Sequence, residues 1–237
     1  MNVNRLGWLL WGISWMGWSL LVAGCASMVA GDGSPPTRYY LLSAMTGRTV
    51  ADHQPRGAVR LALEPVELPD YLSRPQIVSR QGDHRLMVAE SDLWAEELAA
   101  GLARVMVENL SLLLDSDQIW HLPVKRGGRP DFRLWIRMVG FEIDALGRPW
   151  FAARWRLQGP GDQEGAVVGE MTEIRGDPVG RNDQEAQVAA LSALLETFSR
   201  RVAARLTGLR LKQSASIAAP MSSFLPSLPD VAPLPRP

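Results

Sequence analysis

The sequence predicts an α+β domain, with an antiparallel or mixed β-sheet and two long amphipathic helices packed on one face. Several short segments alternate apolar and polar residues, which is typical of half-buried strands. Two longer segments show the period of an amphipathic helix, and the order along the chain is strands, helix, strands, helix. A parallel, doubly wound sheet would need more helices than this sequence offers.

The first strands are expected before residue 91. Residues 38–44 are rich in β-forming residues, and residues 58–66 place Val59, Leu61 and Leu63 on one face of a strand. Residues 75–90 read as two short strands around the turn residues 81–84. A further short strand is expected around His121.

Two helices account for the longer periodic segments. The first is predicted over residues 93–114, with Ser91 or Asp92 as its N-cap and Arg104 and Glu108 paired on its wet face. The second is predicted to begin at the N-cap Asn182 and to end near Gly208. Its apolar stripe consists of Val188, Leu191, Leu195, Phe198, Val202 and Leu206.

A β-hairpin is predicted between residues 131 and 158, followed by a strand near residue 170. The apolar positions change parity at Gly140, which indicates a β-bulge near Val139 and Gly140. With a turn at residues 144–149, the register that pairs apolar residues sets Ile143 opposite Phe151 and Ile136 opposite Leu157. The same register sets Arg137 opposite Arg156.

The other face of this hairpin is unusually basic. Like charges directly opposite each other destabilise a sheet, so the face needs either neighbouring acids, for which Glu170 is the candidate, or an external anion. That anion could be a phospholipid head group or an acidic partner surface. The face consists of Arg133, Trp135, Arg137, Arg154 and Arg156.

The N-terminal segment has the features of an export signal. Residues 6–24 carry no charge and end in small residues, although their length would also permit a membrane anchor. Residues 21–25 resemble the bacterial lipobox, in which the cysteine receives the lipid. We therefore expect a signal peptide over residues 1–24, acylation of Cys25, a tether over 25–37, one domain over 38–212, and a disordered proline-rich tail over 213–237.

No catalytic or metal-binding constellation can be assembled from the sequence. Cys25 is the only cysteine, and the three histidines are far apart, so no metal site and no intramolecular disulfide are predicted. Asp83 and His84 lie in a predicted turn. Lys+Arg and Asp+Glu balance at 25 each, which argues against nucleic-acid binding. The only bound group expected is the covalent acyl lipid on Cys25.

Several segments together resemble the PqiC/YmbA family, the auxiliary lipoproteins of ABC-type lipid transport systems. The resemblance spans residues 38–209, and it is most specific at "PVELPDYLSRPQIV" and at Trp94. It also includes "RYYLL", "DFRLWIRMVGFE", "WRLQG" and the final helix "QVAALSALLETFSRRVAARL".

The resemblance implies a non-enzymatic lipoprotein of the outer membrane that faces the periplasm. Its expected partners are an MCE-domain protein and the associated permease, and association of several copies stays open. Ala26 matters because an Asp after the lipidated cysteine commonly retains Gram-negative lipoproteins at the inner membrane. The characteristic loop of the family maps to Pro69, Tyr71, Leu72, Arg74 and Pro75.

Alternative functions and interpretations are kept open. The loop could anchor a partner through Tyr71 and Leu72, or it could wrap its own sheet and bury both side chains. The domain could also carry lipid in a cavity of its own, whereas a docking module should be solid. An envelope hydrolase is the less favoured alternative because a catalytic constellation is missing.

Overall fold

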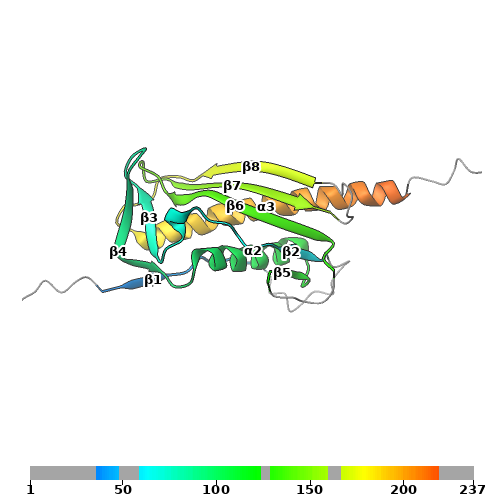
Figure 1. Ribbon diagram of the computed structural model, residues 1–237, viewed down its shortest axis with the longest axis horizontal. Helices are drawn as coiled ribbons and strands as arrows, with labels where there is room; N and C mark the ends of the chain where they lie inside the picture. Colours follow the sequence, from blue (N-terminus) through cyan, green and yellow to red (C-terminus); the bar gives the residue numbers. More distant parts are fainter. Residues whose placement is uncertain (1–35, 48–58, 124–128, 160–166, 219–237) are drawn as a thin grey trace, which may run out of the picture. The chain divides into compact units, whose positions relative to one another are not determined.

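An eight-stranded mixed sheet and two long helices make up the part of the chain that the computed structural model describes, residues 36–47, 59–123, 129–159 and 167–218 (Figure 1). This arrangement confirms the predicted α+β class. Within these residues, no helix combines the length and the apolar character needed to cross a membrane. The elements are β1 (Arg38–Tyr40), β2 (Leu61–Leu63), the 3-10 turn η3 (Asp70–Leu72), β3 (Gln76–Arg80), β4 (Leu86–Trp94), α2 (Leu98–Leu114), β5 (Ile119–His121), β6 (Phe132–Ile143), β7 (Pro149–Gln158), β8 (Val167–Arg175) and α3 (Gln184–Ala218).

The long strand β6 organises the sheet. One edge of β6 pairs with β7, which pairs in turn with β8. The other edge is shared: β2 runs parallel to the start of β6, and β3 runs parallel to its end. Because β5 continues the first branch and β4 and β1 continue the second, the sheet divides into two branches on this side of β6.

Residues 64–75, here called the crossing segment, run along β6 from one branch to the other. The Glu67 amide donates to the Ile136 carbonyl at 3.0 Å, and the Met138 amide donates to the Glu67 carbonyl at 2.8 Å. These bonds satisfy the edge of β6 between the branches, where no regular strand lies beside it. The crossing segment is therefore an ordered part of the domain.

Both helices cover the inner face of the sheet, and Figure 1 shows α3 running along it behind β6 and β7. The Phe198 ring packs 4.7 Å from the Phe151 ring and 5.9 Å from the Trp155 ring, between centroids. Asn109 of α2 donates to the Ser199 hydroxyl of α3 at 3.2 Å in the buried contact between the helices. The predicted apolar stripe of α3 is buried throughout, which confirms that prediction.

The predicted helix ends differ from the observed ones. Helix α2 begins at Leu98 and not at residue 93, because Leu93 and Trp94 are held in β4 by pairing with β1. The Asp183 carboxylate, rather than Asn182, caps α3 by accepting from the Ala186 amide at 2.9 Å. Helix α3 also continues past Gly208 to Ala218, into the predicted tail.

The continuation of α3 has a simple cause. A glycine inside a helix costs only about 1 kcal/mol, and Leu209, which follows Gly208, is still buried. No proline interrupts the helix before Pro220. Residues 219–237 lie outside the described part of the chain, so the prediction for the rest of the tail is untested.

The register of the β6–β7 hairpin also differs from the prediction. Phe141 lies opposite Phe151, and Ile136 lies opposite Trp155, two residues away from the predicted pairing. The turn is shorter than predicted because the Asp144 carboxylate accepts from the Leu146 and Arg148 amides, at 2.8 and 2.9 Å. Gly147 has a φ of 80°, which a glycine adopts without strain. The predicted bulge is confirmed between Met138 and Gly140.

Candidate functional site

A surface pocket of about 510 Å³ opens where the sheet divides. We call it the fork pocket. The crossing segment forms one of its walls, and the end of β4 with the start of α2 forms the other. Its volume lies within the range of small-ligand and side-chain binding sites. Its lining residues are Leu68, Leu72, Ser73, Arg74, Pro75, Trp94, Ala95, Glu96, Glu97, Leu98 and Ala99.

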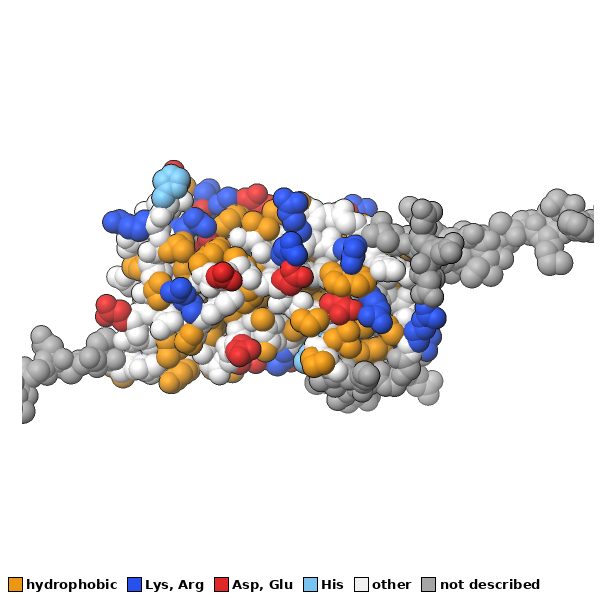
Figure 2. Space-filling view, in the orientation of Figure 1, with side chains coloured by type: hydrophobic (Ala, Val, Ile, Leu, Met, Phe, Trp, Pro, Cys, Tyr) orange, Lys and Arg blue, Asp and Glu red, His pale blue; other side chains and the backbone are white. Residues whose placement is uncertain are grey.

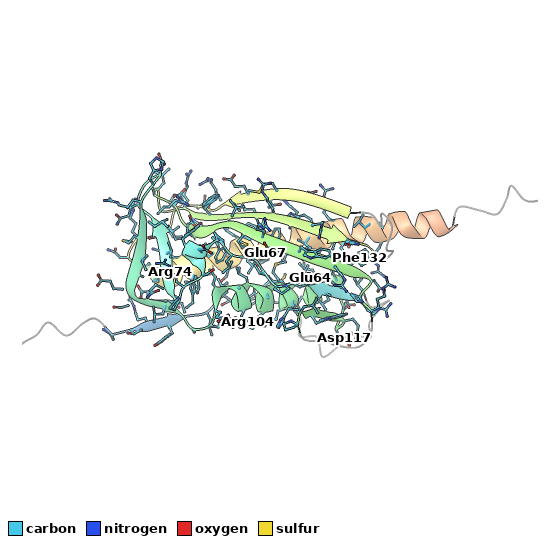
Figure 3. The ribbon with its side chains drawn as sticks, viewed as in Figure 1. Glu64, Glu67, Arg74, Arg104, Asp117 and Phe132 are labelled. Atoms are coloured by element: carbon cyan, nitrogen blue, oxygen red, sulfur yellow. The ribbon has the colours of Figure 1, made fainter. Side chains whose placement is uncertain are left out.

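The loop wall of the pocket is rigidly attached to the sheet. The η3 turn is closed by the Leu72 amide, which donates to the Pro69 carbonyl at 2.9 Å. The Trp94 amide donates to the Pro75 carbonyl at 2.7 Å and ties the loop to β4. Leu72 points into the core with 3% of its surface exposed, whereas Arg74 and Pro75 are exposed at the rim. Figure 3 labels Arg74.

The opposite wall combines a buried aromatic side chain with acidic residues. Trp94 is buried, and Glu96 accepts from the Arg104 guanidinium at 2.7 Å. Arg104 also donates to the Leu42 carbonyl at 2.9 Å, so it joins this wall to the segment after β1. The hydrogen bond to Glu96 raises the pKa of Arg104. The pocket thus has an apolar floor, an arginine on one rim and acidic groups on the other, which suits an amphipathic side chain or a short peptide segment.

Tyr71 does not line the pocket but anchors its loop to the sheet. Its hydroxyl donates to the fully buried carboxylate of Glu142 at 2.7 Å, and the Arg80 guanidinium donates to the same carboxylate at 2.7 Å. Burial, followed by the hydrogen bond to Glu142, raises the pKa of Tyr71 above its usual range. Because a buried carboxylate is costly unless it is paired, this network fixes the loop over the β6 bulge.

Of the predicted loop residues, Leu72, Arg74 and Pro75 line the fork pocket, whereas Pro69 and Tyr71 support it from outside. Their role toward a partner stays a prediction. Sequence reasoning missed Glu142, although a glutamate inside the apolar run "GFEID" next to a bulge is a signal for a buried ionic network.

The predicted arginine face lies on the outer side of the sheet, away from the helices, and Figure 2 shows basic side chains over β6 and β7. Two details of the prediction are wrong. Arg137 lies opposite Arg154, and Arg156 lies opposite Trp135, because the turn is shorter. Glu170 points to the helix side, where it pairs with Arg205 of α3 at 2.5 Å, and so it does not neutralise this face.

Other predicted positions are placed as follows. Cys25 and Ala26 lie outside the described residues. Asp83 and His84 are exposed in the β3–β4 turn, consistent with ordinary turn chemistry. Among the described residues, no group of three or more histidine, cysteine, aspartate or glutamate side chains is placed to hold a metal ion.

The fold and the pocket define a single α+β domain with one mixed sheet, two helices and a pocket at the sheet division. A family model described as "ABC-type transport auxiliary lipoprotein component" matches residues 39–203. The chain belongs to this family. It is thus an auxiliary lipoprotein component of ABC-type transport, and this confirms the family resemblance drawn from the sequence.

Solved structures support the fold. A protein from Xanthomonas campestris of the DUF330 family is 16% identical, with a TM-score of 0.59 over 76% of this chain and 99% of that one. A structure described only as an uncharacterized protein is 21% identical, with a TM-score of 0.57 over 73% of this chain and 99% of that one. No curated protein sequence matches the chain.

Proposed function

We propose that this lipoprotein is a non-catalytic auxiliary component of an MCE/ABC-type lipid transport system. In this proposal, Cys25 carries the acyl chains, and the domain is anchored in the outer membrane on its periplasmic face. The domain docks the periplasmic MCE-domain protein, which connects to the permease. Membership of the auxiliary lipoprotein family supports the transport role, and the resemblance of the sequence supports the particular system.

The fork pocket is the observation that carries the docking proposal. The most family-specific loop of the sequence does not fold away completely: it leaves Arg74 and Pro75 exposed at the rim of a pocket with an apolar floor. Rigid walls reduce the entropy cost of binding, and buried aromatic or aliphatic anchors usually supply most of the energy at such interfaces. We expect an apolar side chain of the MCE protein to occupy the pocket between Arg74 and Glu97.

A pair of neighbouring alanines allows a controlled test. Ala99 lines the pocket, whereas Ala100 follows it in the same helical turn and is exposed outside the pocket. Ala99→Trp should fill the pocket and weaken binding of the MCE protein on the order of tenfold or more, whereas Ala100→Trp should bind as the wild type. Bio-layer interferometry measures the affinity of the purified lipoprotein for the MCE protein.

A charge reversal provides the second arm of this test. Arg74→Glu should also weaken binding and should leave the melting temperature unchanged, because the side chain is exposed. If Ala99→Trp and Arg74→Glu both bind the MCE protein as tightly as the wild type, the pocket is not the docking site.

The volume of the fork pocket is also consistent with a second function, that of a lipid carrier. A pocket of about 510 Å³ could receive part of an acyl chain. Native mass spectrometry of the protein purified from membranes separates the two functions. A carrier should retain a phospholipid that Ala99→Trp expels, whereas a docking module should carry none.

A further inference from the structure

The arginine face of the sheet carries more positive charge than its surroundings neutralise. Arg133 pairs with Glu64 at 2.8 Å, and Arg137 pairs with Glu67 at 2.6 Å, both across to the crossing segment, where Figure 3 labels the two glutamates. Within the described part of the chain, Arg154 and Arg156 have no carboxylate partner. The face therefore holds two uncompensated guanidinium groups on one strand.

The acidic residues of β8 do not serve these two arginines. Glu170 lies on the helix side and binds Arg205, and Glu173 binds Arg175 at 2.7 Å and the Trp150 indole at 3.0 Å. The residue opposite Arg154 on β8 is Met171, and the residue opposite Arg156 is Gly169. The β8 residues opposite the two arginines are therefore an apolar side chain and a glycine, and neither is charged.

The register of β6 and β7 places two arginines in a position that does not stabilise the fold. Arg137 and Arg154 are direct cross-strand neighbours, and like charges at such positions destabilise a sheet. Glu67 pairs with Arg137 at 2.6 Å, so of these two neighbours Arg154 is the one without a carboxylate partner in the described part of the chain. An external anion at Arg154 would offset this repulsion.

The apolar parts of the face indicate the kind of ligand. The Arg156 guanidinium stacks over the Trp135 ring at 4.3 Å, and Met171 is 50% exposed beside Arg154. Interleaved tryptophan, methionine and arginine suit the interface of a membrane, where aromatic rings sit at the level of the head groups and guanidinium groups bind phosphates.

We propose that the arginine face binds the phosphate groups of an anionic phospholipid surface, with Arg154 and Arg156 as the contacting cations. The face would thereby act as a second membrane contact of an anchored lipoprotein. A single basic cluster binds a membrane weakly, but an acyl anchor raises its effective concentration at the surface. This inference is independent of docking at the fork pocket.

A fluorescent label can report this contact in the lipidated full-length protein. Because Cys25 is the only cysteine, Met171→Cys introduces one new thiol for an environment-sensitive dye on the arginine face. Leu211→Cys, exposed on α3, is the matched control position. Each labelled protein is reconstituted in vesicles of phosphatidylcholine alone or with added phosphatidylglycerol.

The proposal predicts that phosphatidylglycerol shifts the emission of the Met171→Cys label to shorter wavelength and leaves the Leu211→Cys label unchanged. Added salt should reverse the shift. The pair Arg154→Ala and Arg156→Ala should reduce the apparent affinity for phosphatidylglycerol on the order of tenfold, whereas Arg200→Ala with Arg205→Ala, which removes the same charge from α3, should not.

Two results would overturn the proposal. The first is an emission that does not depend on phosphatidylglycerol or on the two arginines. The second is a shift of the Met171→Cys label to shorter wavelength when the purified MCE protein is added to phosphatidylcholine vesicles without phosphatidylglycerol. This result would assign the face to a protein partner. Binding of the MCE protein to the Arg154→Ala and Arg156→Ala variant tests docking separately, since those residues lie outside the fork pocket.

Discussion

At the scale of single residues, the loop that resembles the family most closely has two kinds of side chain. Leu72 belongs to the core, and Tyr71 is held on the buried Glu142 carboxylate, so these two build the loop. Arg74 and Pro75 are exposed and available to a partner. Substitution of the first pair therefore tests stability, and substitution of the second tests binding.

We expect Leu72→Ala to destabilise the domain by about 2–5 kcal/mol, because it leaves a cavity in a well-packed core. Equilibrium unfolding in urea measures the change. Arg74→Ala is the control and should unfold with the wild-type midpoint. A Leu72→Ala variant as stable as the wild type would mean that the loop does not belong to the core.

Among the elements, strand β6 carries a bulge whose glycine, Gly140, lies under the Trp150 ring. The ring of Trp150 lies over Gly140, where an added Cβ would come within 2.3 Å of the ring. Trp150 is also flanked by the Arg80 and Arg175 guanidinium groups, 5.5 and 5.3 Å from its centroid. The glycine is thus required by close approach of an aromatic side chain.

Gly140→Ala should cost about 1–3 kcal/mol, because the Trp150 ring has to move. A double-mutant cycle with Trp150→Ala checks the cause. The glycine substitution should cost much less when the ring is absent. Equal costs in both backgrounds would assign the requirement for glycine to its backbone.

The ion pair at the start of β6 predicts a dependence of stability on pH. Asp131 binds Arg60 at 2.6 Å, and this hydrogen bond lowers the pKa of the Asp131 carboxyl in the folded state. A lowered pKa means that the stabilisation is present above the ordinary aspartate value of about 4 and is lost as the pH falls through the folded value. Asp131→Asn and Arg60→Ala should both lose less stability than the wild type on acidification, as measured by unfolding between neutral and acidic pH.

At the scale of the whole molecule, the crossing segment links the two proposed surfaces. It forms one wall of the fork pocket, and its Glu64 and Glu67 neutralise half of the arginines on the outer face. A partner in the pocket and a membrane at the arginine face would therefore both lie next to the same segment. In our proposal, the lipid anchor on Cys25 determines which membrane that would be.

Acylation of Cys25 is tested by Cys25→Ala. The variant should accumulate as an uncleaved precursor and should incorporate no labelled palmitate, because the proposed acceptor of the lipid is the Cys25 thiol. Radiolabelling followed by gel electrophoresis measures both results. Normal incorporation of palmitate into the variant would contradict the assignment.

Sorting to the outer membrane is tested by Ala26→Asp in a Gram-negative host. The variant should move to the inner-membrane fraction on a sucrose gradient, whereas Ala26→Ser should stay with the outer membrane. An unchanged distribution of the aspartate variant would argue against this sorting route.

The fold class, the buried stripe of α3, the bulge at Gly140 and the family could all be predicted from the sequence. These features depend on periodicity, on a single parity change and on a specific loop, all of which are local in the sequence. The end of β4 at Trp94 was not predictable in this way, because an apolar residue there fits a helix as well as a strand and only pairing with β1 decides.

The assembly of the candidate sites depends on contacts between segments that are far apart in the sequence. The fork pocket is formed by the crossing segment and by the junction of β4 with α2, and the sequence does not state that these segments come together. The hairpin register depended on the Asp144 side chain closing a short turn, and a shift of two residues keeps every apolar side chain on the same face. For that reason the apolar pattern placed the arginine face correctly but could not identify which arginines face each other, since contacts between strands are set by geometry and not by periodicity.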